Sequence, residues 1–286
     1  GGGRVRGREQ GMALVIVLWI SMLLALLAGS FAFSVRTETR VVAGIKERAE
    51  ARALAEAVVS WVSIGMLQWQ PEERPFQLNG EPFVWPFGRR EVSVRATEAS
   101  GRLNPNSTSR ETLVLALRYA GVPADSEDAL ADAIIDWRDT DDARGLNGAE
   151  APDYERAGVV PGPKDAPYDS IDELGQVLGM SADILERLRP VLTLHGSGAV
   201  DPTFAPREVL LMLAMGDTDL VDDVVASDNA DVTQRIPWEG YETGESGYLH
   251  LDISVSFDGG SRYLFSAVVS PAQATELMPI LEWREH

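Results

Sequence analysis

The sequence predicts an α+β protein in which a long N-terminal helix packs on an antiparallel sheet, with a large helical domain inserted between the strands. The first observation is an uncharged run, residues 12–35, that continues into an Ala-rich stretch without proline. The second is that alternating polar and apolar residues occur around residue 92 and again after residue 247. The third is the helical pattern of residues 104–195 between them. One sheet interrupted by a helical insertion is the simplest topology for this order.

The composition excludes several classes of protein. The chain has 286 residues, with 44 acidic and 25 basic side chains, a net charge of -19 and no cysteine. Disulfides, thiolate zinc sites, iron–sulfur clusters and cysteine nucleophiles are therefore excluded. Because phosphate binding needs an excess of basic side chains, we expect no nucleic-acid partner. The chain has three histidines and lacks the serine-hydrolase, phosphate-loop and zinc-protease motifs, so we expect that it is not an enzyme.

The N-terminus has the charge pattern of a membrane segment. Residues 1–11 are basic, and the uncharged residues 12–35 are long enough to span a bilayer. The basic flank predicts a cytoplasmic N-terminus and a body on the other side. Three interpretations are open: a single-span anchor, a secretory signal cut between residues 29 and 32, and a leader cut after Gly11 that leaves Met12 first. The apolar run is longer than a secretory signal requires.

Residues 12–70 read as one continuous helix, half in lipid and half in water. Its second half is rich in Ala, Glu and Arg, has an apolar residue every three or four positions, and is ended by Pro71. The alternative is an anchor followed by a separate short helix.

The remainder of the chain divides into three parts. Residues 71–103 predict the first strands of the sheet, and residues 236–286 predict the rest of it. Within the last part, residues 248–269 form a hairpin around an Asp-Gly-Gly turn, and residues 278–283 add an edge strand with its proline at the edge.

The acidic helical insertion is expected over residues 104–235. Residues 103–113 and 200–210 form a weak internal repeat. Thr108 and Glu111 have capping-box spacing at the start of the first copy, and the surrounding segment is typical of a helix-hairpin-helix unit. A second such unit begins at Ser170, while residues 217–233 predict a looser acidic stretch. Over residues 121–190 acidic side chains outnumber basic ones by 17 to 6, which argues against DNA binding by these units.

The acidic loop of the insertion is the candidate metal site. Residues 139–150 place oxygen-bearing side chains at several positions of an EF-hand loop, but Arg144 stands where that loop requires glycine. The loop is therefore not an EF-hand, although its carboxylates could still converge on a hard cation. The alternative is a solvated acidic loop with helix-capping roles. The candidate calcium ligands are Asp139, Asp141, Asp142, Asn147, Glu150 and Asp153.

Several motifs together resemble a known family. They are the leader ending Glu-Gln-Gly before the apolar run, the segment DWRDTDD followed by NGAE and DY, the run PYDSIDEL, and the late segment VDPTFAPREVLLML. The chain resembles the minor pseudopilin K (GspK) family of type II secretion systems over essentially its whole length. The resemblance implies a pilin-like fold with a helical domain inserted in the sheet. It also implies cleavage after Gly11, N-methylation of Met12 and calcium in the body.

One position differs from ordinary pseudopilins and indicates where the subunit would sit. Counted from Met12, the fifth residue is Ile16, where ordinary pilins and pseudopilins carry a glutamate that compensates a neighbouring subunit's N-terminus. Proteins of the family that this chain resembles are similar in lacking it. A subunit at the filament tip has no neighbour above it and needs no such carboxylate, which would be costly in the membrane.

The resemblance therefore implies a tip subunit of the inner membrane, with a periplasmic body, that serves pseudopilus assembly and protein export. The implied partners are the other minor pseudopilins, the major pseudopilin, the prepilin peptidase, the secreted cargo, and the membrane through residues 12–35. The alternative is a single-span, calcium-binding periplasmic protein of another envelope complex.

Overall fold

The computed structural model describes residues 6–87, 90–159, 162–227, 229, 231–244, 246–270 and 280–286. Within them, the side chains of residues 6–13, 31–40, 72, 86 and 87 are not described. The chain divides into two compact units, residues 1–53 and 54–286. It is an α+β protein with a five-stranded antiparallel sheet and many helices, which confirms the predicted fold class at this level.

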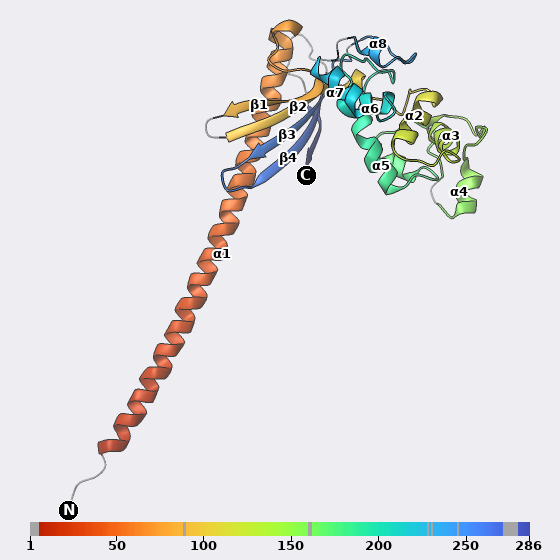
Figure 1. The fold of residues 1–286 in the computed structure, drawn as a ribbon. Helices are drawn as coiled ribbons and strands as arrows, with labels where there is room; N and C mark the ends of the chain where they lie inside the picture. The colour runs from red at the N-terminus through yellow and green to blue at the C-terminus, as the bar shows by residue number, and fades with distance from the viewer. Residues whose placement is uncertain are drawn as a thin grey trace, which may run out of the picture. The chain divides into compact units, whose positions relative to one another are not determined.

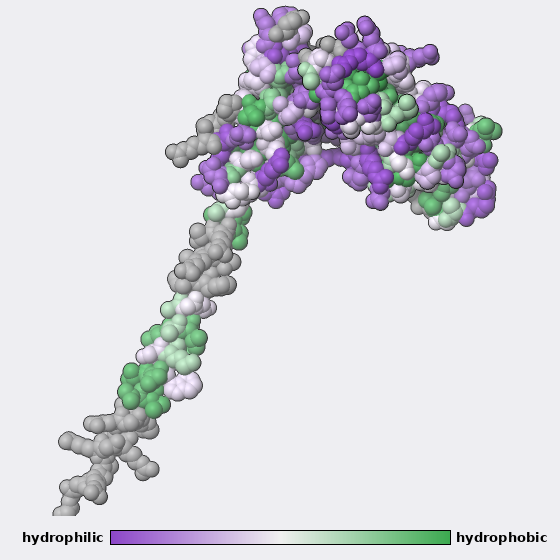
Figure 2. All heavy atoms as spheres, in the orientation of Figure 1, coloured by the Kyte–Doolittle hydropathy of each residue, from purple (hydrophilic) through white to green (hydrophobic). Residues whose placement is uncertain are grey.

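The first unit consists of the N-terminal part of α1, a helix that runs from Arg6 to Gln68. The described side chains from Leu14 to Leu27 include twelve large apolar residues, each more than half exposed. Figure 2 shows this apolar surface on α1. A helix that is apolar on all sides normally lies in an apolar environment. The described residues nevertheless contain no helix that meets both the length and the apolarity needed to cross a bilayer.

The second unit begins with the last turns of α1, whose apolar stripe is buried. Leu54, Val58 and Val62 are each at most 4% exposed, at the spacing that places them on one helix face. The ring of Trp61 lies 6.0 and 6.1 Å from the rings of Phe83 and Trp85 in strand β1. A short 3-10 helix, η1 (Pro71–Glu73), follows α1, in agreement with the predicted helix end at Pro71.

The sheet has the order β1-β2-β3-β4-β5, and every neighbouring pair is antiparallel. The strands are β1 (Asn79–Phe87), β2 (Arg90–Glu98), β3 (Leu249–Ser256), β4 (Arg262–Val269) and β5 (Ile280–Glu285). In β3, Leu249, Leu251 and Ile253 are buried while His250 and Asp252 between them are not, so the strand has one apolar and one polar face. The predicted hairpin and edge strand are both present.

The helices of the insertion lie between β2 and β3, which are neighbours in the sheet although 150 residues separate them in sequence (Figure 1). They are α2 (Arg110–Tyr119), α3 (Glu127–Arg138), α4 (Ala151–Ala157), α5 (Ala182–Leu188), α6 (Arg207–Leu213), α7 (Thr218–Ala226) and α8 (Val232–Arg235). Three 3-10 helices also lie in this segment: η2 (Ala99–Gly101), η3 (Ile171–Gln176) and η4 (Arg189–Val191). Their apolar faces form one core that includes Leu117, Ile134, Trp137, Tyr154, Leu210 and Met212.

Two local expectations for the insertion were wrong. The stretch at 217–233 is not loose, because α7 and α8 occupy it. Asp217 caps α7 by accepting a hydrogen bond from the Leu220 N–H, and Val221 and Val224 bury its inner face. The second wrong expectation is the capping box of Thr108 and Glu111. The residue that caps α2 is Ser109, whose hydroxyl accepts a hydrogen bond from the Thr112 N–H. The Thr108 hydroxyl instead donates to the carbonyl of Gly198, where the insertion folds back on itself.

The internal repeat corresponds to a repeated backbone turn. The Asn104 side chain accepts a hydrogen bond from the Asn106 N–H, and the Asp201 side chain accepts one from the Thr203 N–H, both at 2.9 Å. Each turn leads into a helical hairpin, α2–α3 in the first copy and α6–α7 in the second. The weak sequence similarity therefore reflects two structurally equivalent helix entries.

A buried carboxylate closes the point where the insertion leaves and re-enters the sheet. Glu98, at the end of β2, is 0% exposed. Its Oε2 accepts from the N–H of Ser100 at 2.6 Å and from the Ser100 hydroxyl. Its Oε1 accepts from the N–H of Gly247 at 2.8 Å and from the Ser246 hydroxyl. One side chain thus joins the two ends of the segment that runs from β2 to β3.

Candidate functional site

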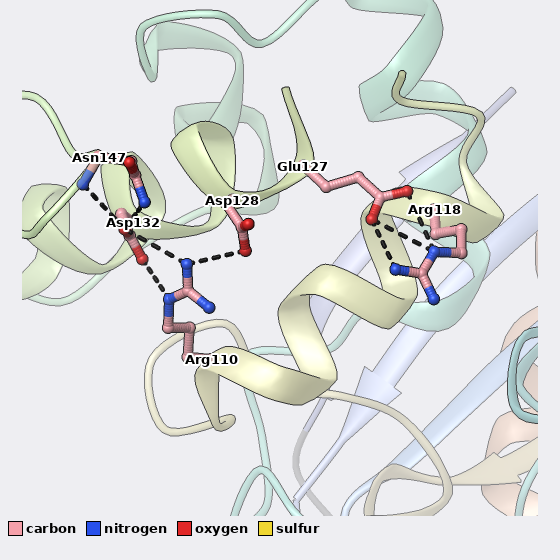
Figure 3. A network of polar contacts seen from close by, with 6 residues as sticks. All are labelled: Arg110, Arg118, Glu127, Asp128, Asp132 and Asn147. Carbon is pink, nitrogen blue, oxygen red and sulfur yellow. Dashed lines mark hydrogen bonds and ion pairs between the residues drawn. The ribbon is translucent and has the colours of Figure 1, made fainter. Parts of the chain in front are cut away.

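The acidic loop connects α3 to α4, and its base is held by α3. Asp132, which is 5% exposed, accepts hydrogen bonds at its Oδ2 from the main-chain N–H and the side-chain amide of Asn147, at 3.1 and 3.2 Å. Arg110 of α2 pairs with both Asp132 and Asp128, and Arg118 pairs with Glu127 (Figure 3). Both arginines of α2 are thus bound to carboxylates of α3, and Asn147 has a structural role in the loop.

Asp136 fixes the middle of the loop, one helical turn further along α3. Both of its carboxylate oxygens accept from the Gly145 N–H at 3.1 Å. Gly148 approaches so closely that a Cβ atom there would lie 1.9 Å from Asp136 Oδ2. Burial and the neighbouring charge of Asp139 raise the pKa of Asp136, while the hydrogen bond from Gly145 opposes the increase.

Two oxygen atoms of the predicted ligands are buried without a hydrogen bond. They are Oδ1 of Asp139, at the end of α3, and Oε1 of Glu150, which precedes α4 and is 6% exposed; neither has a partner within the described part of the chain. Burial raises the pKa of Glu150 to about 7, and the charges of Asp136, Asp165, Asp139 and Asp142 raise it as well. Burial and Asp141 likewise raise the pKa of Asp139. These carboxylates therefore lie close enough to repel one another.

The remaining predicted ligands are placed differently. The Asp141 side chain accepts from the Ala143 N–H and is exposed, as is Asp142. Asp153 accepts from the Glu150 N–H and forms ion pairs with Arg144 and Arg156. That hydrogen bond, followed by the two arginines, lowers the pKa of Asp153. Asp153 is thus already charge-compensated, whereas Glu150 is not.

A hard cation would satisfy the unpartnered oxygens of Asp139 and Glu150, and Asp136 lies close enough to Glu150 to raise its pKa. A calcium ion takes six to eight oxygen ligands, and two buried, unpartnered carboxylate oxygens are the kind of group that it would satisfy. In the described residues no three acidic or histidine side chains already converge with metal-binding geometry. The calcium prediction therefore stays a prediction, now centred on Asp136, Asp139 and Glu150. Sequence reasoning missed Asp136 and Asp165, although Asp132, Asp136 and Asp139 recur along one face of α3 at helical spacing.

The predicted processing residues lie in α1. Gly11 and Met12 belong to the helix, and their side chains are outside the described part of the chain. Ile16 is 53% exposed. The span predicted at residues 12–35, the leader at residues 1–11 and the processing site stay predictions.

Comparison with known proteins relates the insertion to a family. Residues 94–197, from the middle of β2 to just beyond η4, match the family model of type II secretion system protein K. The fold is similar to a chain in the crystal structure of the GspK-GspI-GspJ complex from the enterotoxigenic Escherichia coli type 2 secretion system, with a TM-score of 0.56 and 16% identity. The similarity covers 87% of this chain and 99% of that one. Residues 94–197 thus carry the sequence pattern of type II secretion system protein K.

These two matches confirm the resemblance that the motifs indicated. The matched region includes the acidic loop, the helical hairpin α2–α3 and α5, so the protein K signature lies largely in the insertion. A comparison with curated protein sequences found no match.

Proposed function

We propose that this chain is a structural, non-enzymatic minor pseudopilin at the tip of a type II secretion pseudopilus, where it serves pseudopilus assembly and protein export across the outer membrane. The match of residues 94–197 to the family carries this proposal. The position of the insertion agrees with it, since a long helix packed on a sheet is the pilin-like part and the insertion is the family-specific part.

Two features support the tip over the shaft. Ile16 presents an exposed apolar side chain where a shaft subunit would carry a glutamate, and a carboxylate without a partner would be costly in lipid. The insertion adds seven helices beside the sheet in the described residues, which broadens the subunit beyond what a tightly packed shaft accommodates.

The proposed location is the bacterial inner membrane, with a single pass, a cytoplasmic N-terminus and a periplasmic body. The exposed apolar side chains from Leu14 to Leu27 support burial of this part of α1 in lipid. Arg4, Arg6 and Arg8 precede the apolar run and support the orientation.

The proposed partners follow from the same assignment. The similar chain of known structure comes from a GspK-GspI-GspJ complex. By analogy, the partners here are two other minor pseudopilins, together with the major pseudopilin, the prepilin peptidase and the secreted cargo. We propose calcium as a structural ion of the acidic loop, where it would neutralise Glu150 and Asp139 and so stabilise the insertion. The alternative function is that of a calcium-binding protein in another envelope complex, which the acidic loop alone would also suit. If that alternative is correct, deletion of the chain should leave type II export intact.

Processing at the N-terminus tests the pseudopilin assignment. We expect that co-expression with a prepilin peptidase yields a mature chain that begins at N-methylated Met12, as measured by mass spectrometry of the N-terminal peptide. Leucine in place of Gly11 should retain residues 1–11, because a bulky side chain at the cut crowds the peptidase cleft. A wild-type chain that keeps its leader, or one that begins between residues 29 and 33, would contradict the assignment.

A further inference from the structure

The polar face of the sheet carries a histidine that contacts the insertion. His250 lies in β3 between the buried residues Leu249 and Leu251, so its side chain is on the other face. Its Nε2 lies 2.8 Å from the hydroxyl of Thr193. Thr193 is 1% exposed and belongs to the insertion, where its N–H donates to the carbonyl of Leu103. His250 is thus a polar bridge between the sheet and the inserted domain.

A second histidine lies on the insertion side of the same contact. The ring of His195 stacks on that of Tyr248 with a centroid distance of 4.7 Å, and lies 6.1 Å from the ring of His250. Its Nε2 is buried and has no hydrogen-bond partner among the described residues. The nearest carboxylate oxygen, Oε1 of Glu282, is 3.8 Å away, which is too far for a hydrogen bond.

The surroundings of the two histidines are electrically balanced when both rings are neutral. A cavity of about 390 Å³ lies against His250 and brings solvent to this contact. Four arginines and four carboxylates line it together with His286: Arg95, Arg102, Arg189, Arg284, Glu186, Glu208, Asp252 and Glu282. The charge of Arg102 lowers the pKa of His250, while the charges of Asp252 and Glu208 act on Arg102 itself.

We propose that His195 and His250 form an acid-sensitive latch between the insertion and the sheet. Both rings are neutral at neutral pH, where stacking and the Thr193 contact hold the insertion against β3. Protonation places two positive charges 6.1 Å apart beside Arg102, and the only carboxylate at contact distance from the pair in the described chain is Glu282. The contact therefore weakens in acid while the rest of each domain stays folded.

The direction of the pH dependence follows from the titration of the two rings. Burial, and then the charges of Arg102 and His195, lower the pKa of His250 well below 6.5. Burial also lowers the pKa of His195, against the attraction of Glu282. Because the unfolded chain binds protons more readily, the stability from this contact is complete above pH 6.5 and decreases as the pH falls below it.

Hydrogen exchange of the full chain in detergent, followed by mass spectrometry at pH 7.5 and 5.0 and corrected for intrinsic rates, tests the latch. We expect protection to fall at least about tenfold in residues 191–196 and 249–252 at pH 5.0, since one unit of pKa shift corresponds to a factor of ten. The α2–α3 hairpin should change far less. His250→Gln keeps a group that can bond Thr193 but cannot be charged, so it should remove most of the loss.

His286→Gln is the matched control, because His286 lines the same cavity and bonds Ser266 on the sheet alone. It should leave the acid response unchanged. Equal loss of protection in wild type and His250→Gln, or a response confined to the α2–α3 hairpin, would overturn the proposal. Histidine ring NMR gives an independent result should His250→Gln fold poorly. The proposal fails if the rings of His195 and His250 both titrate at or above 6.5 in the wild type.

Discussion

Replacement of Glu98 by alanine is expected to destabilise the second unit, residues 54–286, by about 3–5 kcal/mol. The Glu98 side chain is fully buried and accepts from two main-chain N–H groups and two hydroxyls at the junction of the insertion with the sheet. Alanine would leave the N–H groups of Ser100 and Gly247 without an acceptor, and each unsatisfied buried donor costs about 1–3 kcal/mol. The loss should also loosen both ends of the insertion, since one carboxylate joins them.

Urea unfolding of the full chain in detergent, followed by tryptophan fluorescence, measures this effect. Glu91→Ala is the control, because Glu91 lies in the same strand, β2, but is exposed. We expect Glu91→Ala to change the free energy of unfolding by less than about 0.5 kcal/mol. A Glu98→Ala variant within 1 kcal/mol of wild type, which is about the effect of losing a single ordinary hydrogen bond, would show that the junction does not depend on this carboxylate.

Glu150→Gln is expected to stabilise the metal-free protein at pH 8 and to abolish its response to calcium. The pKa of Glu150 is raised to about 7 from 4.5, first by burial. The unfolded chain therefore loses this proton at a lower pH than the folded chain does. Stability from the protonated form is complete below pH 4.5 and is lost as the pH rises to about 7. In chelator, we expect the free energy of unfolding of the variant to exceed that of wild type by about 2–3 kcal/mol at pH 8. At pH 4.5 the two free energies should differ little.

Calcium should make wild type more stable than Glu150→Gln at pH 8, the reverse of their order in chelator. A cation binds the ionised carboxylates of Glu150, Asp139 and Asp136, so it stabilises wild type by about 2–3 kcal/mol at a hundredfold excess over its dissociation constant. Glutamine removes the charge at Glu150, one of the two groups with a buried unpartnered oxygen, and should lose most of that gain. Thermal unfolding of wild type and Glu150→Gln, each in chelator and in calcium, measures how much calcium stabilises each protein.

The control for this pair of measurements is Glu155→Gln, which removes an exposed carboxylate from α4, the helix that follows Glu150. It should leave the calcium response intact. The cation proposal would be contradicted if calcium stabilises Glu150→Gln as much as wild type, or stabilises neither protein.

Much of the fold could be predicted because its signals are local. In the hairpin, β3 alternates strictly between buried and more exposed residues and is followed by a Gly-containing turn. The end of α1 has a proline just beyond it. The insertion could be located because segments in which every second residue is apolar precede and follow a segment whose apolar residues have helical spacing. α7 was missed because its sequence is acidic, and its burial of Val221 and Val224 depends on packing within the insertion that no local pattern reveals.

The site was only partly predictable for a related reason. The loop at residues 139–150 was recognised from its own carboxylates, and Asp139 and Glu150 do carry the buried unpartnered oxygens. The sequence could not show that Asn147 donates hydrogen bonds to Asp132, or that Asp153 forms ion pairs with two arginines, because these contacts depend on the path of the loop. Asp136 was missed because it resembles an ordinary helix residue, and its role follows from the hydrogen bonds of Gly145 and the close approach of Gly148.

The tip position is the central claim, and counting and locating the chain on isolated pseudopili tests it most directly. Pseudopili assembled in a strain that carries an epitope-tagged copy of this chain, tagged after His286, should be labelled by gold-conjugated antibody at one end only. The same strain should export its type II cargo, and deletion of the chain should abolish both filaments and export. Label distributed along the filament shaft, or filaments and export that persist without the chain, would contradict the account.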